Sequence, residues 1–538
     1  MSDKENSTKR HTSFCLIFLW YCALAFGLYL LCGLFYEGSD PYVKYFIDYS
    51  ASKERINYFI TNENLYLFPV FIRLKTLLPN VWVLDWVNLF RAVWGISLVH
   101  YLLVRNIPKR FYMLSLLFLS SVLIENVLIE NSLRAAGIYA IAAVLYIHKR
   151  PLHRISQIMG LVIILLVAFI SRVEIPLIIF SYYLVISLIV RKSLPKVAMY
   201  SAIFLLLGNF LVFQKGLQES KGQGKFNLYE RQIYDMGNVD FSTRDSESDI
   251  NIKYLAKALF LQDQGLDSIK FTDFIRYHSL EDYIFNNHEF LSEQSVNLYD
   301  TFTRSLRAFP FLILALIIVS IELMKKKRMS FLQGILIGLV FVFSIFIMQI
   351  IADMHLRVIF IILLFILALG WVESAPKSSM LTWELLFFLG ILHVFVSTRK
   401  EVVKLKNIES INRSFVSVHS QYAAQGKEVF LGYMFTDILG SNRLFSKNLV
   451  MWNFVDCGNM NEIYIFKQEL IQNFGSSYKR LDEKMQLLSS KGDYIIMDSF
   501  FKKFYIEYIK RVYHKQLDLV LINEISNSGF QVYSPRLK

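Results

Sequence analysis

The strongest constraint on the fold is a series of long apolar runs separated by short charged loops. Hydrophobic residues make up 54% of the 538 residues, and water-soluble chains rarely concentrate so many in unbroken runs. About eleven runs approach the length of a membrane-crossing helix. They lie at about residues 13–35, 81–104, 111–127, 135–147, 155–170, 175–190, 197–213, 309–323, 331–351, 358–372 and 381–396. The pattern predicts an α-helical polytopic membrane protein.

The charged loops indicate how the runs alternate across the membrane. Four basic loops follow runs that would end on the side of the N-terminus: RNIPKR, HKRPLHR, RKSLPK and KKKR. Because basic loops favour the cytoplasm, we expect a cytoplasmic N-terminus and an extracytoplasmic segment after residue 400. The first run is too long for a signal-peptide core and is interpreted as a retained anchor. The formal charge of +13 is then loop charge, and no nucleic-acid partner is expected.

Two domains are predicted from this organisation. Residues 1–400 form the transmembrane domain, with outer loops at 37–80 and 214–306, and residues 401–538 form a small extracytoplasmic α/β domain. Its expected strands lie at 428–433, 493–499, 517–525 and 529–535, and its expected helices at 461–474 and 500–515. Because this segment has neither a phosphate-binding loop nor a nucleophile elbow, we interpret it as a structural or acceptor-binding cap. The four cysteines have no disulfide or zinc-site spacing.

Ionisable residues gather at the predicted outer ends of the runs. They are Glu37, Asp40, Glu130, Arg134, Arg172, Glu174, His355 and Arg357. A single charged side chain at a span end often only extends to the aqueous interface. A group of charged side chains at one face of a bundle is typical of a functional site. A carboxylate can act as general base toward a hydroxyl, and arginine or histidine can hold a phosphate. These residue types together indicate transfer from a phosphate-linked donor at the membrane surface.

Two of these positions have a structural interpretation beside the functional one. Asp40 precedes Pro41, so it can cap an interfacial helix as well as serve in catalysis, and the two roles are compatible. Arg91 lies within the second run, where it either contacts a donor phosphate or belongs to a structural ion pair.

Four stretches of the sequence resemble the GT-C superfamily of polytopic glycosyltransferases, which use polyprenyl-phosphate-linked sugars. FYEGSDPYVKYFIDYSA resembles the region after the first span, with Asp40 at the acid position and Glu37 as the alternative. IENSLRAAGIYAIAAVLY resembles the region of a second acid between the third and fourth spans, with Glu130 at that place. A C-terminal extracytoplasmic α/β domain is also common in that superfamily.

The other two stretches contain basic residues. ISRVEIPLII resembles an Arg-Pro-Glu-like element, in which Arg172 and Glu174 match and Val173 replaces proline. DMHLRVIFIIL resembles a late His/Arg element, in which His355 and Arg357 match but the usual tyrosine after the arginine is absent.

The resemblance implies transfer of a sugar, with inversion, from a polyprenyl-phosphate donor to an extracytoplasmic glycan or lipid acceptor. The expected setting is the lipid bilayer of a bacterial cytoplasmic membrane. Asp40 would be the base, and Glu130 would assist it or would bind a metal or the acceptor. The substrate phosphate would be held by Arg134, Arg172, Glu174, His355 and Arg357. No Asp-x-Asp motif follows the first run, so a divalent cation stays an open possibility. An O-antigen-type polymerase or ligase and a lipid-linked glycan transporter or flippase are the alternatives.

Overall fold

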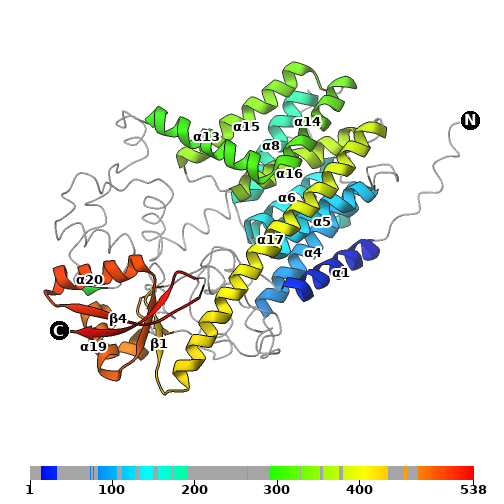
Figure 1. The fold of residues 1–538 in the computed structure, drawn as a ribbon. Coiled ribbons are helices and arrows are strands. Elements are labelled where there is room, and N and C mark those ends of the chain that lie inside the picture. Colours follow the sequence, from blue (N-terminus) through cyan, green and yellow to red (C-terminus); the bar gives the residue numbers. More distant parts are fainter. Residues whose placement is uncertain are drawn as a thin grey trace, which may run out of the picture.

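The structure is a computed structural model, and it describes the chain in segments. These are residues 14–32, 73, 77, 83–105, 112–128, 132–148, 155–171, 174–191, 208, 263–264, 290–327, 329–351, 356–374, 380–433, 453–456, 470–526 and 528–538. Over these residues the chain is mostly helical, and a small sheet lies near the C-terminus (Figure 1). The predicted combination of a helical part with a C-terminal α/β part is therefore confirmed at this level.

The helical part is a bundle whose members coincide with the predicted apolar runs. They are α1 (Phe14–Cys32), α4 (Val83–Val104), α5 (Tyr112–Leu128), α6 (Ser132–His148), α7 (Ile155–Ser171), α8 (Glu174–Arg191), α14 (Pro310–Lys325), α15 (Phe331–Ile351), α16 (Leu356–Ser374) and α17 (Met380–Ala423). The run expected at 197–213 lies outside the described residues except for Gly208. A loop of two residues joins α7 to α8, so these two helices pack as antiparallel neighbours.

Helix α6 is the central member of the bundle, because it packs against α4, α7, α8 and α16. Its residues from 134 to 145 are all buried, and many are alanine or glycine. Small side chains let neighbouring helices approach closely. At Gly137 the approach is close, since a Cβ atom there would overlap Cγ2 of Ile361 on α16 and would come within 2.8 Å of its Cδ1.

Two buried histidines in the bundle, His100 and His148, have polar partners. His100 lies between the Tyr21 hydroxyl, 2.9 Å from Nδ1, and the Ser115 hydroxyl, 3.0 Å from Nε2. At the C-terminal ends of α6 and α16, His148 Nε2 lies 2.7 Å from the Glu373 carboxylate. These contacts satisfy polar groups that would otherwise be costly inside an apolar core.

The lengths of the apolar helices bear on the predicted membrane spans. Among the residues whose side chains are described, no helix taken alone combines the length and apolar content expected for crossing a bilayer. One bent pair reaches this standard jointly: Gln294–Ala308 and Pro310–Lys325, which meet at 92°. The first of these belongs to α13 (Phe290–Ala308), a helix that begins within the predicted outer loop 214–306 and ends two residues beyond it.

The C-terminal part contains a five-stranded sheet with the order β2-β1-β3-β5-β4. Its strands are β1 (Val429–Leu431), β2 (Asn453–Phe454), β3 (Tyr494–Met497), β4 (Leu517–Glu524) and β5 (Gln531–Leu537). Strands β1, β2 and β3 are parallel, and β5 is antiparallel to β3 and β4. The four predicted strands are confirmed, and β2 is an addition.

Three further elements are described in this part of the chain: η7 (Gly475–Lys479), α19 (Leu481–Lys491) and α20 (Ser499–Tyr513). Helix α20 matches the prediction for 500–515, and it begins where Asp498 accepts a hydrogen bond from the Phe501 amide at 2.8 Å. Helix α19 follows the predicted helix at 461–474, of which the structure describes only the last residues. The sheet and these helices enclose their own core, separate from that of the bundle.

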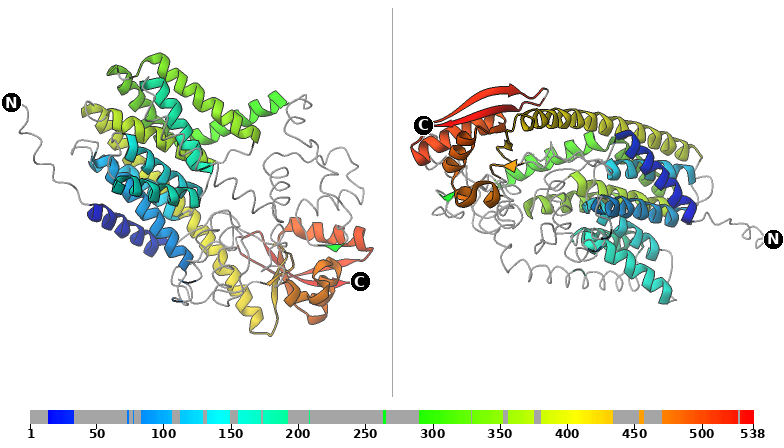
Figure 2. Two further views of the ribbon diagram at one scale, coloured as in Figure 1. Left: turned by 180° about the vertical axis from the view of Figure 1, so that it is seen from behind. Right: turned by 90° about the horizontal axis from the view of Figure 1, so that it is seen from below.

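Helix α17 connects the two parts without interruption (Figures 1 and 2). It has 44 residues and continues across the domain boundary predicted at residue 400. Its C-terminal turns pack on the sheet domain, where the Tyr422 ring lies 4.5 Å from that of Tyr494 and the Phe415 ring 5.4 Å from that of Phe530. The last bundle helix and the support of the C-terminal domain are therefore one element.

Candidate functional site

The candidate site lies at the end of the bundle from which α17 leads to the C-terminal domain. The predicted basic loops flank the opposite end, where His148 and Glu373 join α6 to α16. Helices α6, α8 and α16 all begin toward the site end. The first turn of a helix carries partial positive charge and unsatisfied N–H groups. Three such turns in neighbouring helices make this end of the bundle favourable for an anion.

Arg134 is the predicted site residue that the structure describes best. It lies in the first turn of α6, its side chain is buried, and its guanidinium carbon is 5.3 Å from the ring centroid of Phe360 on α16. Phe360 also contacts Phe309, at 5.3 Å between ring centroids, at the corner between α13 and α14. The aromatic face fixes the plane of the guanidinium and keeps its charge near the ends of α6 and α16.

Arg91 on α4 is a second buried cation of the bundle. Its Nη1 donates to Ser171 Oγ on α7 at 3.1 Å, and its backbone carbonyl accepts from the Tyr139 hydroxyl at 2.9 Å. Ser171 is the last residue of α7, and Arg172 follows it directly in the chain. Arg91 was predicted to bind phosphate or to join an ion pair; the contact seen here is with a serine hydroxyl. This contact links α4 to the turn between α7 and α8.

The structure describes three of the eight predicted site residues. Arg134 and Glu174 are described with their side chains, and Arg357 with its backbone only, as the second residue of α16. Glu174 begins α8, where a carboxylate is stabilised by the helix dipole, so its position has a structural reason as well. The remaining predictions lie outside the described residues: Glu37, Asp40, Glu130, Arg172 and His355. Phe360 was not predicted, because an aromatic residue in an apolar run has no distinguishing pattern.

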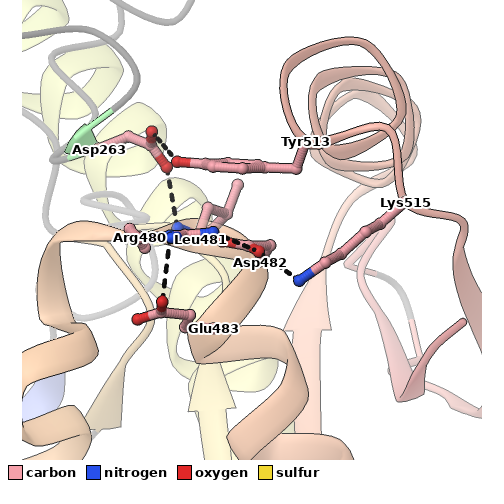
Figure 3. A network of polar contacts seen from close by, with 7 residues as sticks. All are labelled: Asp263, Arg480, Leu481, Asp482, Glu483, Tyr513 and Lys515. Atoms are coloured by element: carbon pink, nitrogen blue, oxygen red, sulfur yellow. Dashed lines mark hydrogen bonds and ion pairs between the residues drawn. The ribbon is translucent and has the colours of Figure 1, made fainter.

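A second polar cluster ties residue Asp263 to the C-terminal domain (Figure 3). One carboxylate oxygen of Asp263 accepts from the Leu481 amide at 2.8 Å, and the other accepts from the Tyr513 hydroxyl. The N-cap residue of α19, Arg480, makes no capping hydrogen bond with its side chain. Asp263 therefore supplies the missing acceptor from a distant part of the chain.

Next to this contact, the buried carboxylate of Asp482 binds two cations. Arg480 Nη2 lies 3.0 Å away and Lys515 Nζ 2.6 Å away (Figure 3). Burial alone would raise the pKa of Asp482, but these hydrogen bonds more than offset it, so its pKa is lower than the ordinary value. The hydrogen bond to Asp482 raises the pKa of Arg480. Burial and then the nearby Asp263 raise the pKa of Tyr513, which stays protonated and donates to Asp263.

A buried lysine lies at the carboxyl end of β2. Lys484 Nζ donates to the Val455 carbonyl at 2.8 Å and lies 3.7 Å from the Asp456 carboxylate, and both charged side chains are buried. These contacts fasten α19 to the end of β2 and account for the lysine as a structural group. In the described part of the chain, no group of three or more His, Cys, Asp or Glu side chains could hold a metal ion.

Comparisons of the chain with protein-family models, with curated proteins and with solved structures gave no significant match.

Proposed function

We propose that the protein is an integral-membrane glycosyltransferase of the GT-C type, which moves a sugar from a polyprenyl-phosphate donor to an extracytoplasmic glycan or lipid. The observation that carries the proposal is the position of Arg134. This buried cation lies among the first turns of α6, α8 and α16, at the bundle end from which α17 leads to the C-terminal domain. That arrangement suits a phosphate at the foot of a folded outer domain.

The outer surface of the bundle supports a membrane location. Phe331 and Leu332 on α15 and Ile155 on α7 are more than 70% exposed. Along the same helices, Leu339, Phe343, Met159 and Ile163 are exposed as well. Exposed apolar side chains of this extent on two helices are unfavourable in water and typical of a surface that contacts lipid.

The proposed reaction is one displacement at the anomeric carbon. Asp40, with Glu37 as the alternative, takes the proton from an acceptor hydroxyl while the oxygen of that hydroxyl bonds to the anomeric carbon. The bond from that carbon to the phosphate oxygen breaks, and the configuration inverts. Arg134, with Arg172, His355 and Arg357, holds the leaving phosphate, and Glu130 assists the base or the acceptor. The C-terminal domain gathers the acceptor above the site.

The first experiment measures sugar transfer in membranes supplied with a mixture of polyprenyl-phosphate sugars, with products identified by mass. Asp40→Asn is expected to lower the rate about 10²–10⁴-fold, because a general base contributes that much. Arg134→Gln is expected to lower it about 10²-fold, because the developing phosphate charge loses a fixed cation.

Arg105→Gln is the matched control for Arg134→Gln. The Arg105 guanidinium also lies 5.3 Å from an aromatic ring, that of Tyr101, but it sits at the opposite end of the bundle and is exposed. Its loss should leave transfer unchanged. Full activity of Asp40→Asn would remove Asp40 from the chemistry. Absence of product from the unmodified chain, together with movement of an intact lipid-linked glycan across the membrane, would favour the flippase alternative.

A further inference from the structure

Helix α13 lies across the end of the bundle beside the candidate site. It packs against α14, α15 and α16, and the chain turns by 92° at Phe309 into α14 (Figures 1 and 2). Phe309 is buried and contacts Phe360, the same ring that the Arg134 guanidinium covers. The corner between α13 and α14 is therefore one side chain away from the predicted phosphate ligand.

The side chains of α13 fall into three sectors around the helix, at 100° per residue. The sector toward the bundle holds Gln294 and Ser305, which are buried, and Leu298, Thr301 and Ala308, which are partly buried. This packed sector is mostly polar or small. The other two sectors face outward, and they differ in chemistry.

The first outward sector is mostly apolar, although Ser295 and Thr303 lie within it. It contains Val296, Tyr299, Phe302 and Leu306, which are 59%, 71%, 45% and 43% exposed. The second outward sector is charged and contains Asp300, Arg304 and Arg307. Asp300 and Arg304 lie one turn apart, with 3.4 Å between their charged groups, and both are exposed. Helix α13 thus has one side on protein, one apolar side and one polar side.

The boundary between water and lipid matches these three sides at once. In water, the apolar sector would be exposed at a cost of about 25 cal/mol per Å² of apolar surface. Inside the hydrocarbon of a bilayer, the exposed charges would be strongly unfavourable. At the boundary between water and lipid, the apolar sector contacts acyl chains and the charged sector contacts water and headgroups. Helix α13 also packs against α15, whose exposed Leu339 and Phe343 belong to the proposed lipid-facing surface.

We infer that α13 lies in the surface of a lipid bilayer, with Val296, Tyr299, Phe302 and Leu306 among the acyl chains and Arg304 and Arg307 among the headgroups. The helix marks the membrane boundary at the level of Arg134. A lipid-linked substrate therefore approaches Arg134 past the corner between α13 and α14, with its phosphate already at the depth of the guanidinium. The position inferred for α13 rests on the membrane location proposed above, and the approach of a lipid-linked substrate rests on the proposed function as well.

The test places single cysteines along α13 in a full chain whose native cysteines, Cys15, Cys22, Cys32 and Cys457, are replaced by serine. Each variant carries a nitroxide label and is reconstituted in vesicles of phosphatidylcholine and phosphatidylglycerol. Collision rates are then measured with oxygen, which concentrates in lipid, and with a nickel chelate, which stays in water. Y299C and F302C report the apolar sector, D300C and R304C the charged sector, and S305C the packed sector.

The inference expects a several-fold higher ratio of oxygen to nickel collisions at 299 and 302 than at 300 and 304, with low rates of both at 305. L339C and F343C on α15 are the controls for the membrane location itself. If these controls are rich in oxygen collisions but 299 and 302 collide with nickel as often as 300 and 304 do, α13 lies in water and the inference is wrong. If 299 and 302 are shielded from both reagents, another protein covers the sector and the inference is wrong. If the α15 controls collide mainly with nickel, both the proposed membrane location and the inference are wrong.

Discussion

At the scale of single residues, the buried Asp482 has the clearest dependence on pH. Its pKa is lower in the folded chain than the ordinary value, so its ion pairs stabilise the fold above about pH 4 and are lost as the pH falls through the lowered pKa. Asp482→Asn should lower the free energy of unfolding of the C-terminal domain by about 1–3 kcal/mol at pH 7, because two charge-assisted hydrogen bonds weaken. The difference between variant and unmodified chain should shrink in acid.

Hydrogen exchange of residues 481–497, corrected for the intrinsic rate at each pH, would measure this effect in the full chain. Asp518→Asn provides the control, because Asp518 also pairs with a lysine, Lys538 at 2.8 Å, but on the surface, where solvent screens the pair. Equal protection of the Asp482→Asn variant and the unmodified chain at pH 7 would contradict a stabilising role for the buried pairs.

Single residues also show where sequence reasoning stops. Arg134 and Glu174 could be predicted, because loop charges set the direction of each run and hence the end at which each residue lies. The stacking of Arg134 on Phe360 could not, because it depends on the packing of α6 against α16. The same holds for Asp263, whose contact with Leu481 joins residues separated by 218 positions. Local sequence patterns do not predict contacts between residues so far apart in the chain.

At the scale of elements, the close approach of α6 and α16 gives a prediction at Gly137. Gly137→Ala should destabilise the bundle by about 1–3 kcal/mol, because the added methyl group overlaps the Ile361 side chain. The apparent melting temperature of the solubilised full chain would measure the loss. Gly338→Ala on α15 is the control: no atom lies within 4 Å of the position of its Cβ, and alanine is favoured over glycine in a helix by about 0.5–1 kcal/mol.

A second substitution tests the cause. Ile361→Ala removes the atoms that the new methyl group would meet, so the double variant should lose less stability than the two single losses added together. Additive losses would show that Gly137→Ala acts in some other way than by overlap with Ile361.

The elements themselves differ in how far the sequence predicts them. The bundle helices follow the apolar runs closely, because a long apolar run has few alternatives to a buried or membrane-bound helix. Strand β2 was missed because it has only two residues, Asn453 and Phe454. Helix α13 was missed because its apolar positions are interspersed with charges, and their separation into sectors depends on which side packs on the bundle.

At the scale of the whole molecule, α17 determines where the C-terminal domain lies relative to the bundle. Its 44 residues correspond to about 66 Å of continuous helix. In its middle, Val403, Lys406 and Asn407 are exposed, so the helix bridges the two parts by its own stiffness over this stretch. The last predicted span ends near residue 396, because the apolar pattern stops there, whereas the helix continues to Ala423.

Lys406→Pro tests this bridge directly. Proline inside a helix costs about 3 kcal/mol and removes a backbone hydrogen bond, so it should hinge α17. Distances between one spin label on the exposed face of α15 and another on exposed Val520 of β4 should then spread over a wider range. Lys406→Ala, which keeps the helix, should leave the distribution unchanged. If both variants give the same width, contacts other than α17 hold the domain in place.

The continuity of α17 also restricts how the chain can vary in evolution. One inserted residue in the exposed stretch turns everything beyond it by about 100° around the helix axis, which changes the position of the C-terminal domain relative to the candidate site. Insertions of about seven or eleven residues return to nearly the same orientation, because they complete two or three turns. Relatives that keep the site should therefore differ in the length of this helix by whole turns. A sequence alignment would show this as insertions and deletions of those lengths.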